Sequence, residues 1–195
     1  MLPLEIRELL VQLGRAMLAE RPNDVHTSAQ WLALRFFARA NTFSRTLSEL
    51  AAYQATSKGT ASQTIKSLEE LGYIEREQSI RDGRSWILSV TDKARDLMDR
   101  DPLASIVKEI ETLDEHRQRG LRDILRQLVN QVGDGSEKSV GSCKDCVYLM
   151  VRRLSWRSHG SKPDLFCQCN DLPVNEEDLD LLCTSFRAKS GTRTS

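Results

Sequence analysis

Apolar residues recur at helical spacing through most of the chain. Residues 2–20 and residues 27–41 each carry one apolar stripe, and a shorter stripe lies in residues 47–52. Residues 103–132 carry enough apolar positions for two further helices, which we expect to be separated near Gly120. Because residues at i, i+3, i+4 and i+7 share one face of an α-helix, this pattern predicts a mainly α-helical protein.

The stretch at residues 57–72 has two faces of different chemistry. One face is apolar and contains Ala61, Ile65, Leu68 and Gly72. The other is small, polar and basic and contains Gly59, Ser62, Gln63 and Lys66. Within this stretch no acidic residue precedes Glu69, so the first half of the helix is suited to approach a polyanion. In a DNA major groove, Gln and Lys side chains reach base edges and short hydroxyls bond phosphates.

The neighbouring segments favour this DNA-binding interpretation over an ordinary amphipathic helix with a solvated outer face. Before it, the short helix at 47–52 and a tight connection ending at the N-cap residue Ser57 form a helix-turn-helix pattern. After it, Gly72 is a helix stop, residues 73–78 and 85–90 have strand character, and residues 81–84 form a hairpin turn with two arginines. This order predicts a winged helix, mainly α with a small β-hairpin wing, whose arginine can enter a minor groove.

The order and spacing of these segments resemble the MarR family of bacterial transcription regulators over about the first two-thirds of the chain. The matching segments are residues 30–34, 47–52, 57–68, 72–76, 81–84 and 88–91. The resemblance implies an obligate homodimer, built from the N- and C-terminal helices of both subunits, that binds a pseudopalindromic operator in double-stranded DNA. It also implies that Asp82 orients the wing and that Arg84 enters the minor groove. Gly83 departs from the family pattern, where a larger residue is common, and should loosen the wing tip.

Together, the helix pattern and the resemblance define a set of expected DNA contacts. They lie before and along the central helix and in the wing turn, and they are Arg45, Ser57, Lys58, Gly59, Thr60, Ser62, Gln63, Lys66, Arg81, Asp82 and Arg84.

The composition permits one good core and a small additional domain. The chain has 195 residues, of which 39% are hydrophobic and 29% are charged, and its formal net charge is zero. A neutral total argues weakly against nucleic-acid binding, but the charge that matters is local to the helix and the wing. No stretch approaches the roughly 20 apolar residues that span a bilayer, and the N-terminus does not resemble a secretory signal. We therefore expect a cytoplasmic protein with no membrane partner.

The predicted elements divide the chain into four segments. Residues 1–132 form a winged-helix and dimerisation domain, with the winged-helix core at about 27–100. Residues 133–142 are rich in Gly and Ser and predict a flexible linker. Residues 143–187 form a cysteine-rich segment, and residues 188–195 are expected to form a disordered tail.

All five cysteines lie beyond the linker. Cys143 and Cys146 are separated by two residues, a spacing that lets neighbouring thiolates hold one metal centre. Cys167, Cys169 and Cys183 follow within about forty residues of the first cysteine. Because the cytoplasm keeps thiols reduced, a metal-binding or redox role is favoured over disulfides or inert core cysteines.

The identity of the metal has two alternatives, an iron–sulfur cluster and zinc. Structural zinc sites usually present two close pairs, whereas here one close pair is joined by single cysteines at longer spacing. The pattern looks like that of high-potential iron–sulfur proteins and of small subunits that carry [4Fe–4S] clusters. It also resembles a cysteine-rich tail of some MarR-like regulators, which Cys167, Pro173 and Cys183 match. This resemblance favours a cluster and implies the ligands Cys143, Cys146, Cys167 and Cys183, with Cys169 as a spare or substitute.

These features predict a dimeric transcription regulator, most simply a repressor, whose DNA affinity responds to the cluster and hence to oxygen, redox state or iron. We expect the tail to act through the helices of the dimer stem. The alternative is a repressor with a structural zinc site that responds to a small aromatic ligand in the cleft between stem and head. No histidine–acid constellation, phosphate-binding loop or dinucleotide fingerprint in the sequence supports an enzyme.

Overall fold

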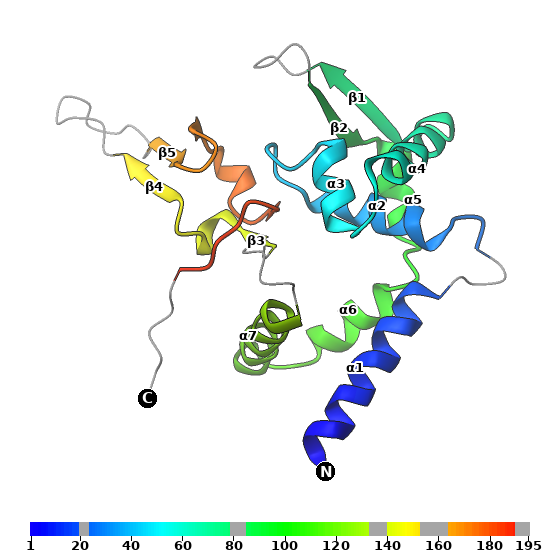
Figure 1. Ribbon diagram of the computed structural model, residues 1–195, viewed down its shortest axis with the longest axis vertical. Coiled ribbons are helices and arrows are strands. Elements are labelled where there is room, and N and C mark those ends of the chain that lie inside the picture. Colours follow the sequence, from blue (N-terminus) through cyan, green and yellow to red (C-terminus); the bar gives the residue numbers. More distant parts are fainter. Residues whose placement is uncertain (20–23, 79–84, 133–139, 153–163, 190–195) are drawn as a thin grey trace.

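The chain folds into a central head, a stem of helices and a small β-rich unit (Figure 1). The computed structural model describes residues 1–19, 24–78, 85–132, 140–152 and 164–189. The stem helices lie on one side of the head in Figure 1, and the β-rich unit lies on another. That unit, residues 140–152 and 164–189, contains all five cysteines and is called the cysteine-rich unit below.

The head consists of short helices and one β-hairpin. Its elements are α2 (Ser28–Arg39), α3 (Leu47–Tyr53), α4 (Lys58–Glu70), β1 (Ile74–Gln78), β2 (Trp86–Val90) and α5 (Asp92–Met98). Each helix begins after a hydroxyl residue whose side-chain oxygen accepts a hydrogen bond from a backbone N–H of the first turn. These caps are Thr27, Thr46, Ser57 and Thr91, and the cap predicted at Ser57 is confirmed.

The two strands of the head form the predicted hairpin. They pair antiparallel, with Ile74 opposite Val90 and Gln78 opposite Trp86. On β2, Val90 and Leu88 are buried against the head, whereas Trp86 is exposed. The hairpin turn at residues 81–84 lies outside the described residues.

The core of the head joins the apolar faces of the helices to the hairpin. Its largest fully buried apolar side chains are Leu34, Phe36, Phe37, Leu50 and Leu68. From α4, the predicted inner residues Ala61, Ile65 and Leu68 are all buried in this core. Burial of this face holds α4 against the head and directs its opposite face outward.

Gly72 ends α4, as expected of a helix stop, and does not lie on the buried face of the helix, where helical spacing had placed it. The helix ends at Glu70, and Gly72 follows the C-cap residue Leu71 with a φ of 72°. Residues with a side chain adopt this left-handed conformation at a cost, so glycine terminates the helix here instead of packing against the core.

Gly120 does not separate the last two helices. The first of them, α6 (Ala104–Glu111), ends before Thr112, and α7 (Glu115–Val132) begins after Asp114. The Asp114 carboxylate accepts a hydrogen bond from the Arg117 N–H at 3.0 Å, so this cap sets the break. A single glycine inside a long helix is tolerated at a cost of about 1 kcal/mol.

The stem consists of α1 (Leu2–Leu18), α6 and α7, and these helices expose their apolar stripes. Neither α1 nor α6 contains a buried residue. Leu9 and Leu13 of α1 are 56% and 44% exposed, and Ile124 and Leu128 of α7 are 56% and 38% exposed. Exposed apolar surface of this extent is typical of protein–protein contacts. Among the described residues, no helix combines the length and apolar character needed to cross a membrane.

Within its described residues, the cysteine-rich unit contains short strands and two 3-10 turns. They are β3 (Gly141–Ser142), η1 (Cys143–Asp145), β4 (Leu149–Arg152), β5 (Asp164–Cys167), β6 (Leu172–Pro173), η2 (Glu176–Asp178) and β7 (Leu182–Cys183). β3 pairs with β7, and β4, β5 and β6 form a second sheet.

Both boundaries of this unit differ from those expected. Gly141 and Ser142, predicted in the linker, pair with β7, and Lys189, predicted in the disordered tail, donates its backbone N–H to the Asp145 carbonyl.

Replacing Gly72 with alanine should lower the free energy of unfolding by about 1–2 kcal/mol, because a Cβ is unfavourable at positive φ. Steric conflict is not the cause, since that Cβ would meet only Lys93 Nζ at 3.9 Å. Urea unfolding followed by circular dichroism measures the loss. The same change at Gly59, inside α4, should not lower stability. Equal stability of Gly72→Ala and the wild type would contradict the terminating role.

Candidate nucleic-acid interface and thiol cluster

The outward face of α4 is exposed along its length. The predicted contacts on it are Lys58, Gly59, Thr60, Ser62, Gln63 and Lys66, and all of them are exposed. Ser57 caps the helix by accepting the Thr60 N–H at 3.1 Å, and its hydroxyl also hydrogen-bonds the Thr60 hydroxyl at 2.9 Å. The first turn contains no acidic residue. The structure therefore brings these residues together on one polar surface.

The charge of Lys66 is only weakly neutralised. Its Nζ lies 3.9 Å from the Glu70 carboxylate, and the two side chains are 70% and 67% exposed. An exposed pair of this kind contributes little and is easily exchanged for another anion. Glu69 turns toward β1 and forms an ion pair with Arg76. The acidic residues of α4 thus lie at its C-terminal end, away from the polar first half.

A tight turn and the hairpin orient α4 from its two ends. Ala55, between α3 and α4, adopts a φ of 50°. Beyond α4, the Thr91 hydroxyl donates to the Gly72 carbonyl at 2.8 Å and ties the start of α5 to the end of α4. Helix-turn-helix followed by a hairpin makes the head a winged helix. The predicted wing-turn contacts lie outside the described residues, and they are Arg81, Asp82 and Arg84.

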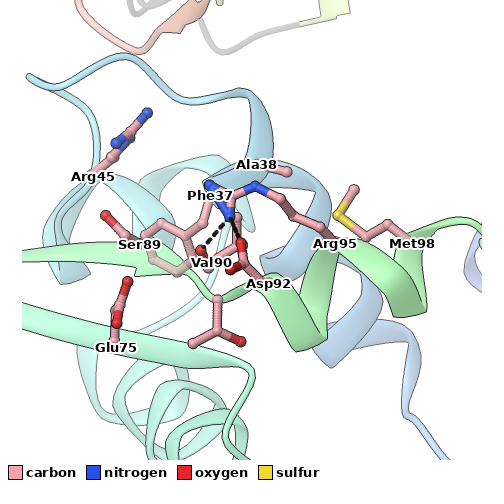
Figure 2. Close-up of a pocket in the computed structure, with 10 residues that line it drawn as sticks. Phe37, Ala38, Arg45, Glu75, Ser89, Val90, Asp92, Arg95 and Met98 are labelled. Atoms are coloured by element: carbon pink, nitrogen blue, oxygen red, sulfur yellow. Dashed lines mark hydrogen bonds and ion pairs between the residues drawn. The ribbon is translucent and has the colours of Figure 1, made fainter.

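Arg45 lies apart from the outward face of α4. Its Nε donates to the Ala40 carbonyl at 2.9 Å, and its side chain borders a cavity of about 660 Å³ between α2, the hairpin and α5, called the head hollow below. Figure 2 shows Arg45 at one side of this hollow and Arg95 across from it. Arg95 is held by the Val90 carbonyl at 3.0 Å and the Asp92 carboxylate at 3.3 Å. The Arg45 side chain therefore lines the head hollow and not the outward face of α4.

The cleft between stem and head is much smaller. It is bordered by Met17 of α1, Trp31 of α2 and Leu103, and it measures about 20 Å³. A space of this size holds about one water molecule. Trp31 is 5% exposed, and its indole N–H donates to the Asp24 carboxylate at 2.6 Å. The aromatic side chain here is a core residue with a satisfied N–H.

Four of the five cysteines are buried in one cluster. Cys143, Cys146, Cys167 and Cys183 are 5%, 5%, 7% and 4% exposed, and they share a core with Leu165 and Phe186. Cys169 is exposed, and all five cysteines are thiols without disulfides. The structure therefore gathers the four predicted ligands and distinguishes Cys169 from them.

Hydrogen bonds polarise the thiols of this cluster. The hydrogen bond from Cys143 lowers the pKa of Cys183 to about 6, against the opposing effect of burial. The same hydrogen bond, together with burial, raises the pKa of Cys143. The side-chain amides of Asn41 and Asn170 each donate at 3.4 Å, to the sulfurs of Cys143 and Cys167. The hydrogen bond from Asn41 opposes the rise in the pKa of Cys143, because a donor to sulfur favours the thiolate.

The donor chemistry of the cluster fits a group bound through thiolates. Buried sulfurs faced by amide N–H groups are the surroundings in which hydrogen bonds tune thiolate-bound metals. In the part of the chain that the structure describes, no three Cys, His, Asp or Glu side chains already surround one ion position. Binding therefore requires the thiol side chains to turn toward one another. The metal and its identity stay predictions.

The cysteine-rich unit is attached to the head at residues 40–45, the docking loop between α2 and α3. Asn41 and Ser44 of this loop are 0% and 1% exposed. The Asn41 backbone N–H donates to the Leu182 carbonyl at 2.8 Å, and the Ser44 hydroxyl accepts the Thr184 N–H at 3.1 Å. Buried polar groups require such partners, so the docking loop depends on the unit for part of its hydrogen bonding.

The docking loop also contacts a carboxylate of the unit and a strand of the hairpin. Asp178, 5% exposed, accepts the Thr42 backbone N–H at 3.1 Å and the Thr42 hydroxyl at 2.9 Å. At the end of the loop, the Arg45 carbonyl accepts the Leu88 N–H of β2 at 2.8 Å. The docking loop thus connects the thiol cluster to β2, the second strand of the hairpin.

Sequence reasoning missed this loop. Asn41 was predicted as the last residue of the helix at 27–41, but α2 ends at Arg39, and Thr42 and Ser44 follow as ordinary polar residues. The partners of Asn41, Thr42 and Ser44 lie 102, 136 and 140 positions later. No local pattern reveals such pairs. Among the described residues, Arg126 of α7 forms an ion pair with Asp145 at 3.2 Å and lies over the Phe186 ring at 5.7 Å, but the buried hydrogen bonds lie at the docking loop.

Comparison with known proteins agrees with the head architecture. Residues 26–85 match the sequence profile of the MarR family. No curated protein matches the chain.

Several solved structures are similar over about two thirds of this chain. A MarR transcriptional regulator from Methanosarcina mazei Go1 is 23% identical, with 65% of this chain and 93% of that chain covered and a TM-score of 0.48. The MepR–DNA complex of S. aureus is 16% identical, with 67% and 97% covered and a TM-score of 0.47. The zinc-responsive MarR family member ZitR of Lactococcus lactis is 19% identical, with 67% and 99% covered and a TM-score of 0.40. Because these identities and scores are low, the fold assignment rests on the chain's own elements.

Replacing Ser44 with alanine should destabilise the cysteine-rich unit by about 1–3 kcal/mol, because it leaves the buried Thr184 N–H without a partner. Hydrogen exchange should speed up at residues 141–146 and 182–187. Ser105→Ala, an exposed site on α6, is the matched control and should leave exchange unchanged. Wild-type exchange rates in Ser44→Ala would show that the docking loop does not hold the unit.

Proposed function

We propose that this protein is a dimeric transcription regulator that binds a pseudopalindromic site in double-stranded DNA, most simply as a repressor. The observation that carries the proposal is the exposed outward face of α4, which presents Gln63 and Lys66 beside a β-hairpin and has no acidic residue in its first turn. The match of residues 26–85 to the MarR family supports it. In this proposal α4 enters a major groove, and Arg84 of the wing enters the adjoining minor groove.

A second copy of the chain completes the DNA-binding unit in this proposal. Exposed apolar residues of the stem, such as Leu9 of α1 and Leu128 of α7, are suited to pack against a partner's stem. A two-fold dimer presents two copies of α4. They read half-sites about one helical turn apart when they enter successive major grooves, and the two-fold symmetry makes the site pseudopalindromic.

We also propose that the cysteine-rich unit holds a metal centre, preferably a [4Fe–4S] cluster, through Cys143, Cys146, Cys167 and Cys183, with Cys169 as a substitute. The burial of these four thiols and the amides facing two of them support this assignment. When bound, a cluster supplies a link between the sulfurs that is sensitive to oxygen, redox state and iron.

The docking loop gives this unit a route to the DNA-binding surface. Asn41 contacts the Cys143 sulfur at one end of the loop, and Arg45 bonds β2 at the other. When the unit loses its fold, Asn41 and Ser44 lose buried partners, and the loop must rearrange to hydrate its polar groups. A difference of about 1–3 kcal/mol between the two loop states is a typical coupling energy and changes DNA affinity about 5- to 150-fold.

A second candidate function is a response to a small aromatic acid, with a structural zinc site in the cysteine-rich unit. The head hollow favours this candidate, because its volume of about 660 Å³ lies in the range of small-molecule sites and its wall includes Phe37 and two arginines. The stem-to-head cleft, at about 20 Å³, has no room for such a ligand in this structure.

Replacing Lys66 with alanine should weaken binding to the specific DNA site by about tenfold or more, because it removes a charged contact in the groove. The site is first obtained by selecting bound sequences from a random duplex library, and affinity is then measured by fluorescence anisotropy. Arg100→Ala removes an exposed positive charge just after α5 and should change affinity less than about twofold. Unchanged affinity in Lys66→Ala would overturn the proposed docking of α4.

Anaerobic purification should yield a brown protein that contains iron and sulfide. Cys183→Ser should lose most of this metal because it removes one of four thiolates, whereas Cys169→Ser should retain it. Elemental analysis for iron, zinc and sulfide measures the content. A colourless protein with one zinc ion supports the second candidate, and equal metal content in Cys183→Ser and the wild type refutes the ligand assignment.

A further inference from the structure

A polar notch lies between the start of α3, the outward face of α4 and the β-hairpin. It measures about 240 Å³, and its rim consists of Thr46, Ser48, Ser62, Arg76, Ser85 and Trp86. Most of these residues carry hydroxyl groups, one carries a guanidinium, and none of the residues lining the notch is acidic. Because they come from three separate parts of the head, the notch is a product of the fold.

Trp86 and Arg76 form one wall of the notch. Trp86 is 48% exposed, although it neighbours buried positions of β2. The Arg76 guanidinium lies 5.9 Å from the centre of the indole ring and donates two hydrogen bonds to the Glu69 carboxylate at the end of α4. The ring and the carboxylate fix the guanidinium and leave N–H donors for a further anion.

Ser and Thr side chains from the start of α3 and from α4 also line the notch. Ser48 and Ser62 are exposed, and neither hydroxyl bonds another side chain or carbonyl among the described residues. The Thr46 oxygen accepts the Glu49 N–H at 3.3 Å, so its own O–H can still donate. Hydroxyl donors that line one notch together with a guanidinium match an anion with several oxygens, such as a phosphate.

Ser62 connects the notch to the outward face of α4, where it precedes Gln63. If α4 lies in a major groove and the wing in the adjoining minor groove, the DNA backbone that separates the two grooves would pass between α4 and the hairpin. The notch lies between α4 and the hairpin, so this backbone would pass over it. A sugar next to a phosphate in the notch would lie beside Trp86, which is 48% exposed. Aromatic side chains pack well against nucleotides.

From this arrangement we propose that the notch seats one backbone phosphate of bound DNA, with Ser48, Ser62 and Arg76 as donors, and that Trp86 packs against the adjoining deoxyribose. The inference rests on the proposed function and adds a contact that carries no base information. Phosphate contacts fix the register and angle of a reading helix. Arg76 and Trp86 are therefore positioning residues between α4 and the wing.

Trp86 fluorescence gives the first test, with the full-length protein and the selected duplex. Adding the duplex should quench the tryptophan emission, and this change should be absent in Trp86→Phe. Trp86→Phe keeps an aromatic ring at the site, and the other two tryptophans, Trp31 and Trp156, are unchanged in both proteins.

Ser48→Ala gives the second test. It should weaken binding by about threefold to tenfold, and by the same factor for the selected duplex and an unrelated one, because a phosphate contact is independent of sequence. An uncharged methylphosphonate at the seated position should weaken wild-type binding and have no further effect on Ser48→Ala. Ser105→Ala should bind like the wild type.

The outcomes separate this inference from the proposed function. If the wild type binds the selected duplex, but Trp86 emission stays constant and Ser48→Ala binds normally, the phosphate seat is refuted and the proposed function stands. A loss in Ser48→Ala that is confined to the selected duplex indicates a base contact and also refutes the seat. If the wild type binds no duplex, the proposed function and the seat both fail.

Discussion

Burial of the polar docking loop is the constraint on which the rest of this structure depends. Asn41 and Ser44 are almost without access to water, and groups of the cysteine-rich unit satisfy part of their hydrogen bonding. Each buried polar group left without a partner costs about 1–3 kcal/mol, a large share of the roughly 5–15 kcal/mol that stabilises a typical domain. The head and the unit are therefore energetically linked through a few side chains.

The same loop touches or adjoins several of the features to which we assign a function. Its first residues contact the thiol cluster, its last carbonyl bonds Leu88 of β2, and the chain then continues into Thr46 and the notch. The contact with the stem is weaker, because Arg126 and Asp145 form an ion pair whose side chains are 33% and 35% exposed. We consequently place the coupling at the docking loop and not in the stem helices, where the sequence had led us to expect it.

The local features of the head were predictable because they follow short-range rules. The caps at Thr27, Ser57 and Thr91, the paired strands and the buried face of α4 each depend on residues within a few positions. Gly72 ends α4 through its φ, as expected of a helix stop, although helical spacing also grouped it with the apolar face. Gly120 was misinterpreted, because it is carried inside a helix whose start is set by Asp114.

The long-range features were less predictable. Cysteine spacing indicated that the thiols gather, but their burial beside Asn41 depends on contacts across more than half of the chain. The position of Arg45 at the head hollow depends on how the docking loop turns, which its sequence position before α3 does not reveal. The wing contacts at Arg81, Asp82 and Arg84 lie outside the described residues and stay predictions.

The central claim, that the state of the cysteine-rich unit controls DNA binding through the docking loop, is tested most directly by one affinity comparison. The dissociation constant for the selected duplex is measured for metal-loaded and chelator-treated protein, in the wild type and in Ser44→Ala. We predict a change of about fivefold or more on treatment of the wild type and a much smaller change in Ser44→Ala, whose loop is already uncoupled. No change in the wild type, or equal changes in both proteins, would contradict the claim.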